Sequence, residues 1–253
     1  MNFFFGFNNH TLKSEIQIPT FINRSFKASN LDLFKCYPEN NRWVLKDISF
    51  NKINDYFYIL KNSSISNNEI YFLADRKIYE NFDSQILKNY NSFTDTSPSY
   101  RSNFKIYIED EGFSSFQSEY PYSMVYKQGS ILSALSSLCN AEADDNYIIF
   151  KNIYYQPIHK NFNGYFVNYL TKKIENKFNL FTNSSNIIKV DKSFIKPEIF
   201  FITDDYLGIP MYLSIKNGYL SLEHTHPPHE YILGNNKFIK VSELKKELNE
   251  IIN

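Results

Sequence analysis

The residues best suited to chemistry gather in one short segment, His224-Thr225-His226-Pro227-Pro228-His229-Glu230. Three of the chain's five histidines lie in it, and a carboxylate follows the last of them directly. Imidazole and carboxylate groups together suit Zn, Fe or Mn, and three protein ligands leave one coordination position open for catalysis. The segment therefore predicts a divalent transition-metal site with His224, His226 and Glu230 as ligands.

An expected β-hairpin positions the first two histidines. Two alternating runs within residues 211–224 flank Asn217-Gly218, and this dipeptide is the strongest short-range signal of a two-residue hairpin turn. In the resulting register Met211 faces His224. Because side chains alternate across a strand, His224 and His226 are expected to share the apolar face of the second strand.

The two prolines decide where the remaining candidates go. Pro227-Pro228 cannot donate to a strand ladder, so the chain is expected to turn there and bring His229 or Glu230 back toward the same point. Glu230 is then the third ligand or a general base, and His229 is a ligand or an acid/base. The corresponding function is a metal-dependent enzyme that acts on a small, carbohydrate-like substrate.

Two other hypotheses fit the same segment. The imidazoles can cap backbone groups that the prolines leave exposed, or form a subunit contact, in a non-enzymatic binding or assembly protein with a structural His-Pro-Pro-His turn. The segment can also bind a ligand without a metal. The directions of His229 and Glu230 separate these hypotheses, because a metal site needs at least one of them near His224.

The spacing around the histidines resembles the first part of a motif found in cupins. Gly218, His224, His226 and Glu230 match it, whereas the closing glycine falls too early, at Gly234. No histidine follows Glu230, so a second cupin motif is missing and the family is not assigned. The resemblance implies that ligands at this spacing can hold a metal in a β-framework.

A pair of carboxylates, Asp204-Asp205, follows an apolar run at residues 199–203. Paired carboxylates directly after a strand can bind a divalent ion or act as acid and base. They are also common in polar turns, and we favour that interpretation. The pair precedes the expected hairpin by only a few residues, so it is expected near the same sheet edge.

Composition narrows the partners. Lys and Arg total 27 against 27 Asp and Glu, without a basic run, so neither nucleic acid nor an anionic membrane surface is expected to bind. A small-molecule or glycan-like ligand and a homo-oligomer are compatible with the sequence.

Cys36 and Cys139 have no metal-type spacing, and reduced thiols are favoured over a disulfide. The apolar start of the chain lacks a basic leader, so a cytoplasmic location is expected.

Strand signals dominate the sequence. It is 18% aromatic, with 24 Phe and 20 Tyr, and aromatic side chains suit pleated, half-buried surfaces. Glycine is scarce, at 7 residues, so asparagine, which tolerates positive φ, is expected to occupy many turns. Besides the hairpin, strands are expected at residues 42–50, 56–60, 69–74, 104–108, 147–155, 186–190 and 198–203.

Helix signals are fewer. An apolar residue at every fourth position predicts an amphipathic helix over residues 161–178. The residues that carry this spacing are Phe162, Phe166, Leu170, Ile174 and Phe178. Ser242 is expected to cap a C-terminal helix, and weaker candidates cover residues 130–143 and 83–89.

Together these elements predict an α+β fold with a strand-rich, largely antiparallel sheet core and a few packed helices. A β-sandwich or barrel with peripheral helices is the alternative. We expect one domain over residues 1–253, because a long surface loop explains the polar, proline-containing stretch near residues 91–103 as well as a linker does.

Overall fold

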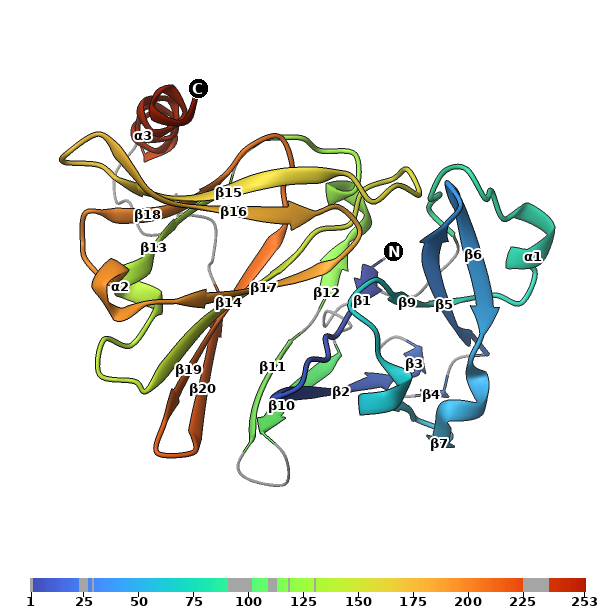
Figure 1. Ribbon diagram of the computed structural model, residues 1–253. Coiled ribbons are helices and arrows are strands. Elements are labelled where there is room, and N and C mark those ends of the chain that lie inside the picture. The colour runs from blue at the N-terminus through green and yellow to red at the C-terminus, as the bar shows by residue number, and fades with distance from the viewer. Residues whose placement is uncertain are drawn as a thin grey trace. The chain divides into compact units, whose positions relative to one another are not determined.

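The computed structural model describes residues 2–22, 27–28, 30–90, 102–108, 113–117, 119–129, 131–224 and 237–253. Antiparallel β-sheets are the dominant regular structure among these residues (Figure 1). The chain divides into two compact units. Unit 1 comprises Met1–Tyr126, Ile153–His159 and Asn183–Ser185, and unit 2 comprises Lys127–Asn152, Lys160–Thr182 and Asn186–Asn253.

Unit 1 contains two five-stranded sheets. In sheet order, sheet 1 consists of β12 (Glu119–Pro121), β1 (Asn2–Phe4), β9 (Ile70–Ala74), β5 (Asp32–Glu39) and β6 (Arg42–Asp47). Sheet 2 consists of β11 (Phe113–Gln117), β10 (Asn103–Ile108), β2 (Leu12–Pro19), β8 (Phe57–Lys61) and β7 (Lys52–Asn54). A small ribbon pairs β3 (Phe21–Ile22) with β4 (Lys27–Ala28), and the helical elements are α1 (Ile78–Asn81) and 3-10 turns at Ser49–Asn51, Asn62–Ser64 and Tyr122–Met124.

Phenylalanines of the N-terminal run supply much of the unit 1 core. Phe3 is fully buried and meets Phe72 of β9 edge to face, with ring centroids 5.6 Å apart. Phe7 packs in the same way on Phe104 of β10, at 5.8 Å. Such contacts between aromatic rings add to the stabilisation from burial. The apolar start of the chain thus belongs to the core.

Unit 2 contains two four-stranded sheets. In sheet order, sheet 3 consists of β13 (Leu132–Ala134), β18 (Ile199–Thr203), β15 (Asn161–Asn168) and β16 (Lys173–Phe181). Sheet 4 consists of β17 (Ser185–Val190), β14 (Asp145–Lys151), β19 (Ile209–Lys216) and β20 (Tyr219–His224). The helical elements are α2 (Leu135–Leu138), α3 (Lys237–Ile252) and a 3-10 turn at Lys192–Phe194.

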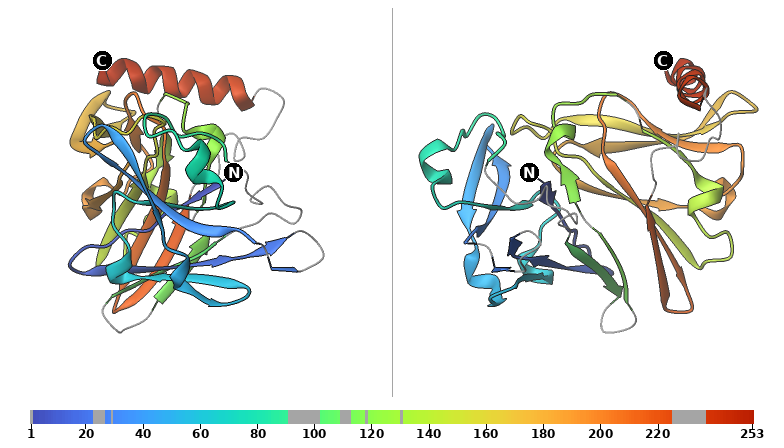
Figure 2. Two further views of the ribbon diagram at one scale, coloured as in Figure 1. Left: turned by 90° about the vertical axis from the view of Figure 1, so that its right-hand side faces the viewer. Right: turned by 180° about the vertical axis from the view of Figure 1, so that it is seen from behind.

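The C-terminal helix α3 covers one face of sheet 3 (Figure 2). Leu248 of this helix is fully buried against a cluster from three strands of the sheet. The cluster consists of Leu132, Tyr165, Val167 and Ile202. Full burial of a leucine contributes roughly 1.5–3 kcal/mol, so this contact fixes the helix on the sheet.

The α+β prediction is wrong. Helices are few, and the described strands form four separate antiparallel sheets besides the small β3–β4 ribbon, so neither one sheet core with packed helices nor the sandwich or barrel alternative describes them. The main physical reason is the segment 161–178. It forms strands β15 and β16 joined by a short loop, because four-residue spacing also places side chains on one face of a strand.

Three further helix predictions need correction. In the described part of the segment 130–143, residues 131–143, the only helix is the four-residue α2, preceded by strand β13. Residues 83–89 contain no helix, and the short helix α1 lies just before them. The C-terminal helix is confirmed, but Ser242 lies inside it and does not cap it.

Asparagine serves the turns, as expected. Four of the six described non-glycine residues with positive φ are asparagines: Asn40, Asn41, Asn183 and Asn217. Asn183 also accepts a hydrogen bond from Tyr154 N (2.7 Å) and donates to Gln156 O (2.8 Å) and Ile158 O (3.0 Å). Its side chain therefore hydrogen-bonds backbone groups that lie outside the described strands.

Among the helices that the structure describes, none is long and apolar enough to cross a membrane.

Candidate functional site

The β19–β20 hairpin that leads to the histidine segment has the predicted register. Met211 pairs with His224, Leu213 with Leu222 and Lys216 with Tyr219, across a two-residue turn at Asn217-Gly218. Positive φ angles of 50° and 78° at these two residues fit the type I′ turn that the dipeptide favours. The hairpin prediction is confirmed.

The register places His224 at the end of a row that crosses three strands of sheet 4. Ile149 of β14 pairs with Met211 of β19, which pairs with His224 of β20. Ile149 and Met211 are both buried. The backbone position of His224 therefore continues a buried row of the sheet.

The other predicted site residues cannot be placed. His226, His229 and Glu230 lie outside the described residues. Within the described ranges, no group of three His, Cys, Asp or Glu residues is arranged to hold a metal ion. The proposed ligands therefore stand as a prediction from sequence.

The carboxylate of Asp204 is bound by two residues of strand β15. Asn163 donates to it twice, from its backbone N and from Nδ2, each at 2.7 Å. The Tyr165 hydroxyl adds a third contact at 3.3 Å. Hydrogen bonds to a carboxylate are stronger than neutral ones, so Asp204 fastens the loop after β18 to β15. This arrangement agrees with the polar turn favoured from the sequence.

The neighbouring Asp205 differs from Asp204 in its exposure and in its side-chain contacts. It is exposed, its φ is +44°, and among the described residues its carboxylate has no ion-pair partner. Its backbone oxygen accepts a hydrogen bond from Gly129 N at 2.9 Å. The side chain of Asp205 is therefore available, while its backbone is fixed.

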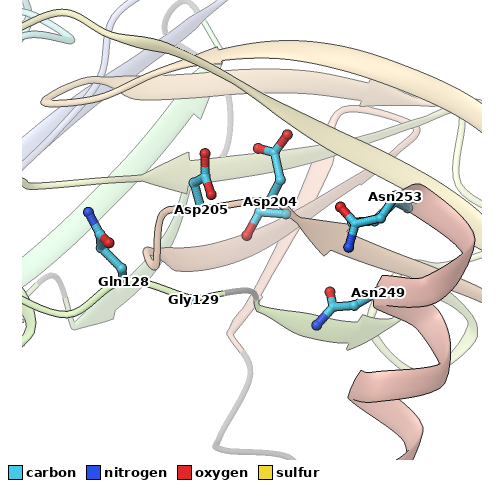
Figure 3. A pocket seen from close by; sticks show the side chains of 8 residues that line it. Gln128, Gly129, Asp204, Asp205, Asn249 and Asn253 are labelled. Atoms are coloured by element: carbon cyan, nitrogen blue, oxygen red, sulfur yellow. The ribbon is translucent and has the colours of Figure 1, made fainter.

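Asp205 lines a polar pocket of about 250 Å³ in unit 2. Three segments form the pocket: the chain before β13, the loop after β18 and the last turns of α3. Its lining residues are Gln128, Gly129, Thr203, Asp204, Asp205, Asn249, Ile252 and Asn253. Figure 3 shows Asn249 and Asn253 extending from α3 toward the loop of Asp204 and Asp205, with Gln128 on the opposite side.

Sequence reasoning found the two aspartates of this pocket and missed its amides. Gln128, Asn249 and Asn253 belong to no motif, and they lie far from residues 204–205 in the chain. Pairing of β13 with β18 and docking of α3 on sheet 3 bring them together. No local pattern in the sequence predicts contacts between segments that are so far apart in the chain.

The cysteines offer no nucleophile. Cys36 and Cys139 are both free, as favoured from the sequence, and both are buried. Burial raises the pKa of the Cys139 thiol to about 12, and it raises the pKa of Cys36 well above its ordinary value. Both thiols therefore stay protonated near neutral pH, and a protonated thiol is a poor nucleophile.

Comparison of the chain with protein-family models, with curated proteins and with solved structures finds no match.

Proposed function

We propose that the protein is a metal-dependent enzyme that acts on a small, carbohydrate-like substrate. The metal is a divalent transition ion (Zn, Fe or Mn) held by His224, His226 and Glu230. The observation that supports this proposal is the β19–β20 register, which carries strand pairing as far as His224. A histidine two residues further along an extended chain would lie on the same face as His224, at a separation that one ion can bridge.

The proposed chemistry follows from the ligand types. Two imidazoles and one carboxylate leave a position for water on a four-coordinate ion, and a bound divalent ion lowers the pKa of that water. Glu230, when it is not a ligand, would accept a proton as general base. His229 would act as ligand or as acid/base next to it.

Metal content of untagged protein tests the proposal. We expect near-stoichiometric metal in the wild type after purification under metal-replete conditions, and its loss in His224→Ala/His226→Ala. The matched control is His10→Ala/His159→Ala, which removes two imidazoles outside the segment and should retain the metal. Circular dichroism of each variant separates loss of ligands from loss of fold. Equal metal content in the two double variants would contradict the proposal.

A non-enzymatic binding or assembly protein is the second candidate, and the exposed large side chains favour it. Phe50 is 82% exposed, Tyr219 at the hairpin turn is 78% exposed, and Leu170 is 73% exposed. Aromatic residues are enriched at protein interfaces. A protein without bound metal whose mass in solution exceeds one chain, and falls to one chain in Phe50→Ser or Tyr219→Ser, would favour this candidate over the enzyme.

A further inference from the structure

Two carboxylates line the pocket beside α3, and of these only that of Asp205 is left without a hydrogen-bond donor among the described residues. Asp204 also lines the pocket, but Asn163 and Tyr165 already bind its carboxylate. Asp205 has no such partner, and no Lys or Arg is among the residues of the described chain that line the pocket. An occupant would therefore meet two carboxylate charges, of which only that of Asp205 is free to accept further hydrogen bonds.

The end of α3 adds to this negative potential. The carbonyl groups in the last turn of a helix carry roughly half a negative charge in total. The last turn of α3 contains no basic residue that would offset it. Asn249 and Asn253, which line the pocket, lie in and directly after this turn. Carboxylate and helix end thus favour the same kind of ligand, a cation.

Amide groups supply the remaining polar lining. Gln128 reaches the pocket from one side, and Asn249 and Asn253 reach it from the other (Figure 3). Each amide oxygen can accept a hydrogen bond from an N–H donor. An ammonium group has three such donors and one positive charge, which matches one free carboxylate and several amide oxygens.

We propose that this pocket binds the ammonium group of a small organic monocation, with Asp205 as its charge partner and the amide oxygens of Gln128, Asn249 and Asn253 as further acceptors. A divalent metal ion fits less well, because hard cations favour several carboxylate or carbonyl oxygens in the first shell, and only one carboxylate here is free. The volume of about 250 Å³ also accommodates an organic group beyond the ammonium.

The backbone of the loop holds the charge partner in place before any ligand arrives. Gly129 N donates to Asp205 O, Ile131 N donates to Thr203 Oγ1 (3.1 Å), and Asp204 is tied to β15. Because the backbone that carries Asp205 is already ordered, little backbone conformational entropy is lost when a ligand binds. The charge itself is exposed, so we expect weak, millimolar binding that decreases as salt is added.

A titration followed by amide NMR shifts tests the proposal with n-butylammonium as probe and n-butanol as its neutral counterpart. We expect n-butylammonium, and not n-butanol, to shift the amides of Gly129 and Asp205. Asp205→Asn should weaken this binding about fivefold. Asparagine tolerates positive φ at least as well as aspartate, so the turn should survive the change. The matched control, Glu175→Gln on exposed strand β16, should bind like the wild type.

Four results would overturn the proposal. They are equal shifts with n-butanol, unchanged affinity in Asp205→Asn, saturation of the same amides by Ca²⁺ or Mg²⁺ at lower concentration, and no shift with n-butylammonium at any attainable concentration. The His224→Ala/His226→Ala variant should bind n-butylammonium normally. Failure of the metal proposal and failure of this one are therefore separate outcomes.

Discussion

Two hairpins of unit 2 show how differently a sequence can encode the same element. The β19–β20 hairpin has a two-residue turn at Asn217-Gly218 between alternating strands. The β15–β16 hairpin has a four-residue connection. Its turn depends on Asn168, whose Oδ1 accepts hydrogen bonds from the N–H groups of Leu170 and Thr171 (3.0 Å each). Only the first hairpin carries a turn signal that can be identified without the structure.

The difference teaches that apolar spacing alone does not separate helix from strand. A four-residue period is close to the helical repeat of 3.6 and is also twice the strand repeat of two. Phe162 and Phe166 share one face of β15 and are buried, whereas Leu170 lies in the connection and is 73% exposed. A helix would have buried all three on one stripe.

The largest expected effect tests this distinction directly. Phe166 is fully buried, with ring centroids 4.6 Å from Phe178, 5.2 Å from Phe194 and 6.1 Å from Phe201. Phe166→Ala should lower the free energy of unfolding by about 3–5 kcal/mol, because it removes a ring and leaves a cavity. Leu170→Ala should change it by less than about 0.5 kcal/mol.

Urea denaturation of both variants measures the two effects. The matched comparison is informative because the helical hypothesis assigns the two side chains to the same stripe. Similar losses in Phe166→Ala and Leu170→Ala would restore that hypothesis and contradict the β15–β16 hairpin.

Much of the strand content could be predicted from local signals. The expected strand at 104–108 matches β10, 186–190 matches most of β17, and 198–203 matches β18 within one residue. The C-terminal helix was also found, because its apolar spacing has no competing strand interpretation over so long a segment. Local spacing could not reveal that 161–178 turns back on itself, since Asn168 and positive φ at Lys172 give no strong turn signal.

The candidate sites could be predicted only where a single segment carries them. The position of His224 follows from the register of one hairpin, and that register was correct. The pocket of Asp205 needs Gln128 and Asn253, which are separated by 125 positions (253 minus 128) in the sequence. Sheet pairing and helix docking create that proximity, and neither can be inferred from the spacing of residues in the sequence.

The second prediction concerns the hydrogen bonds between strand β15 and Asp204, a residue outside the β15–β16 hairpin. Asp204→Ala removes both hydrogen bonds from Asn163 and the contact with the Tyr165 hydroxyl. We expect a loss of about 2 kcal/mol in stability, because the bonds are charge-assisted and a half-buried N–H group loses its partner. Asp205→Asn is the matched control and should stay within about 0.5 kcal/mol of the wild type. Equal losses at the two positions, measured by urea denaturation, would show that Asp204 does not fasten β15.

The smallest expected effect concerns the β19–β20 hairpin, whose turn is formed by Asn217 and Gly218 alone. Gly218 has a φ of +78°, a conformation that costs an L-residue roughly 1–2 kcal/mol. Gly218→Ala should therefore destabilise the protein by about 1 kcal/mol, less than Phe166→Ala or Asp204→Ala. Asn217→Gly keeps the turn accessible and should be close to neutral. Amide hydrogen exchange should show the Gly218→Ala loss mainly in β19 and β20, since the register there depends on this turn. An equal loss of exchange protection in β15 and β16 would mean that the two hairpins unfold together. The Asn217-Gly218 turn would then not by itself set the position of His224.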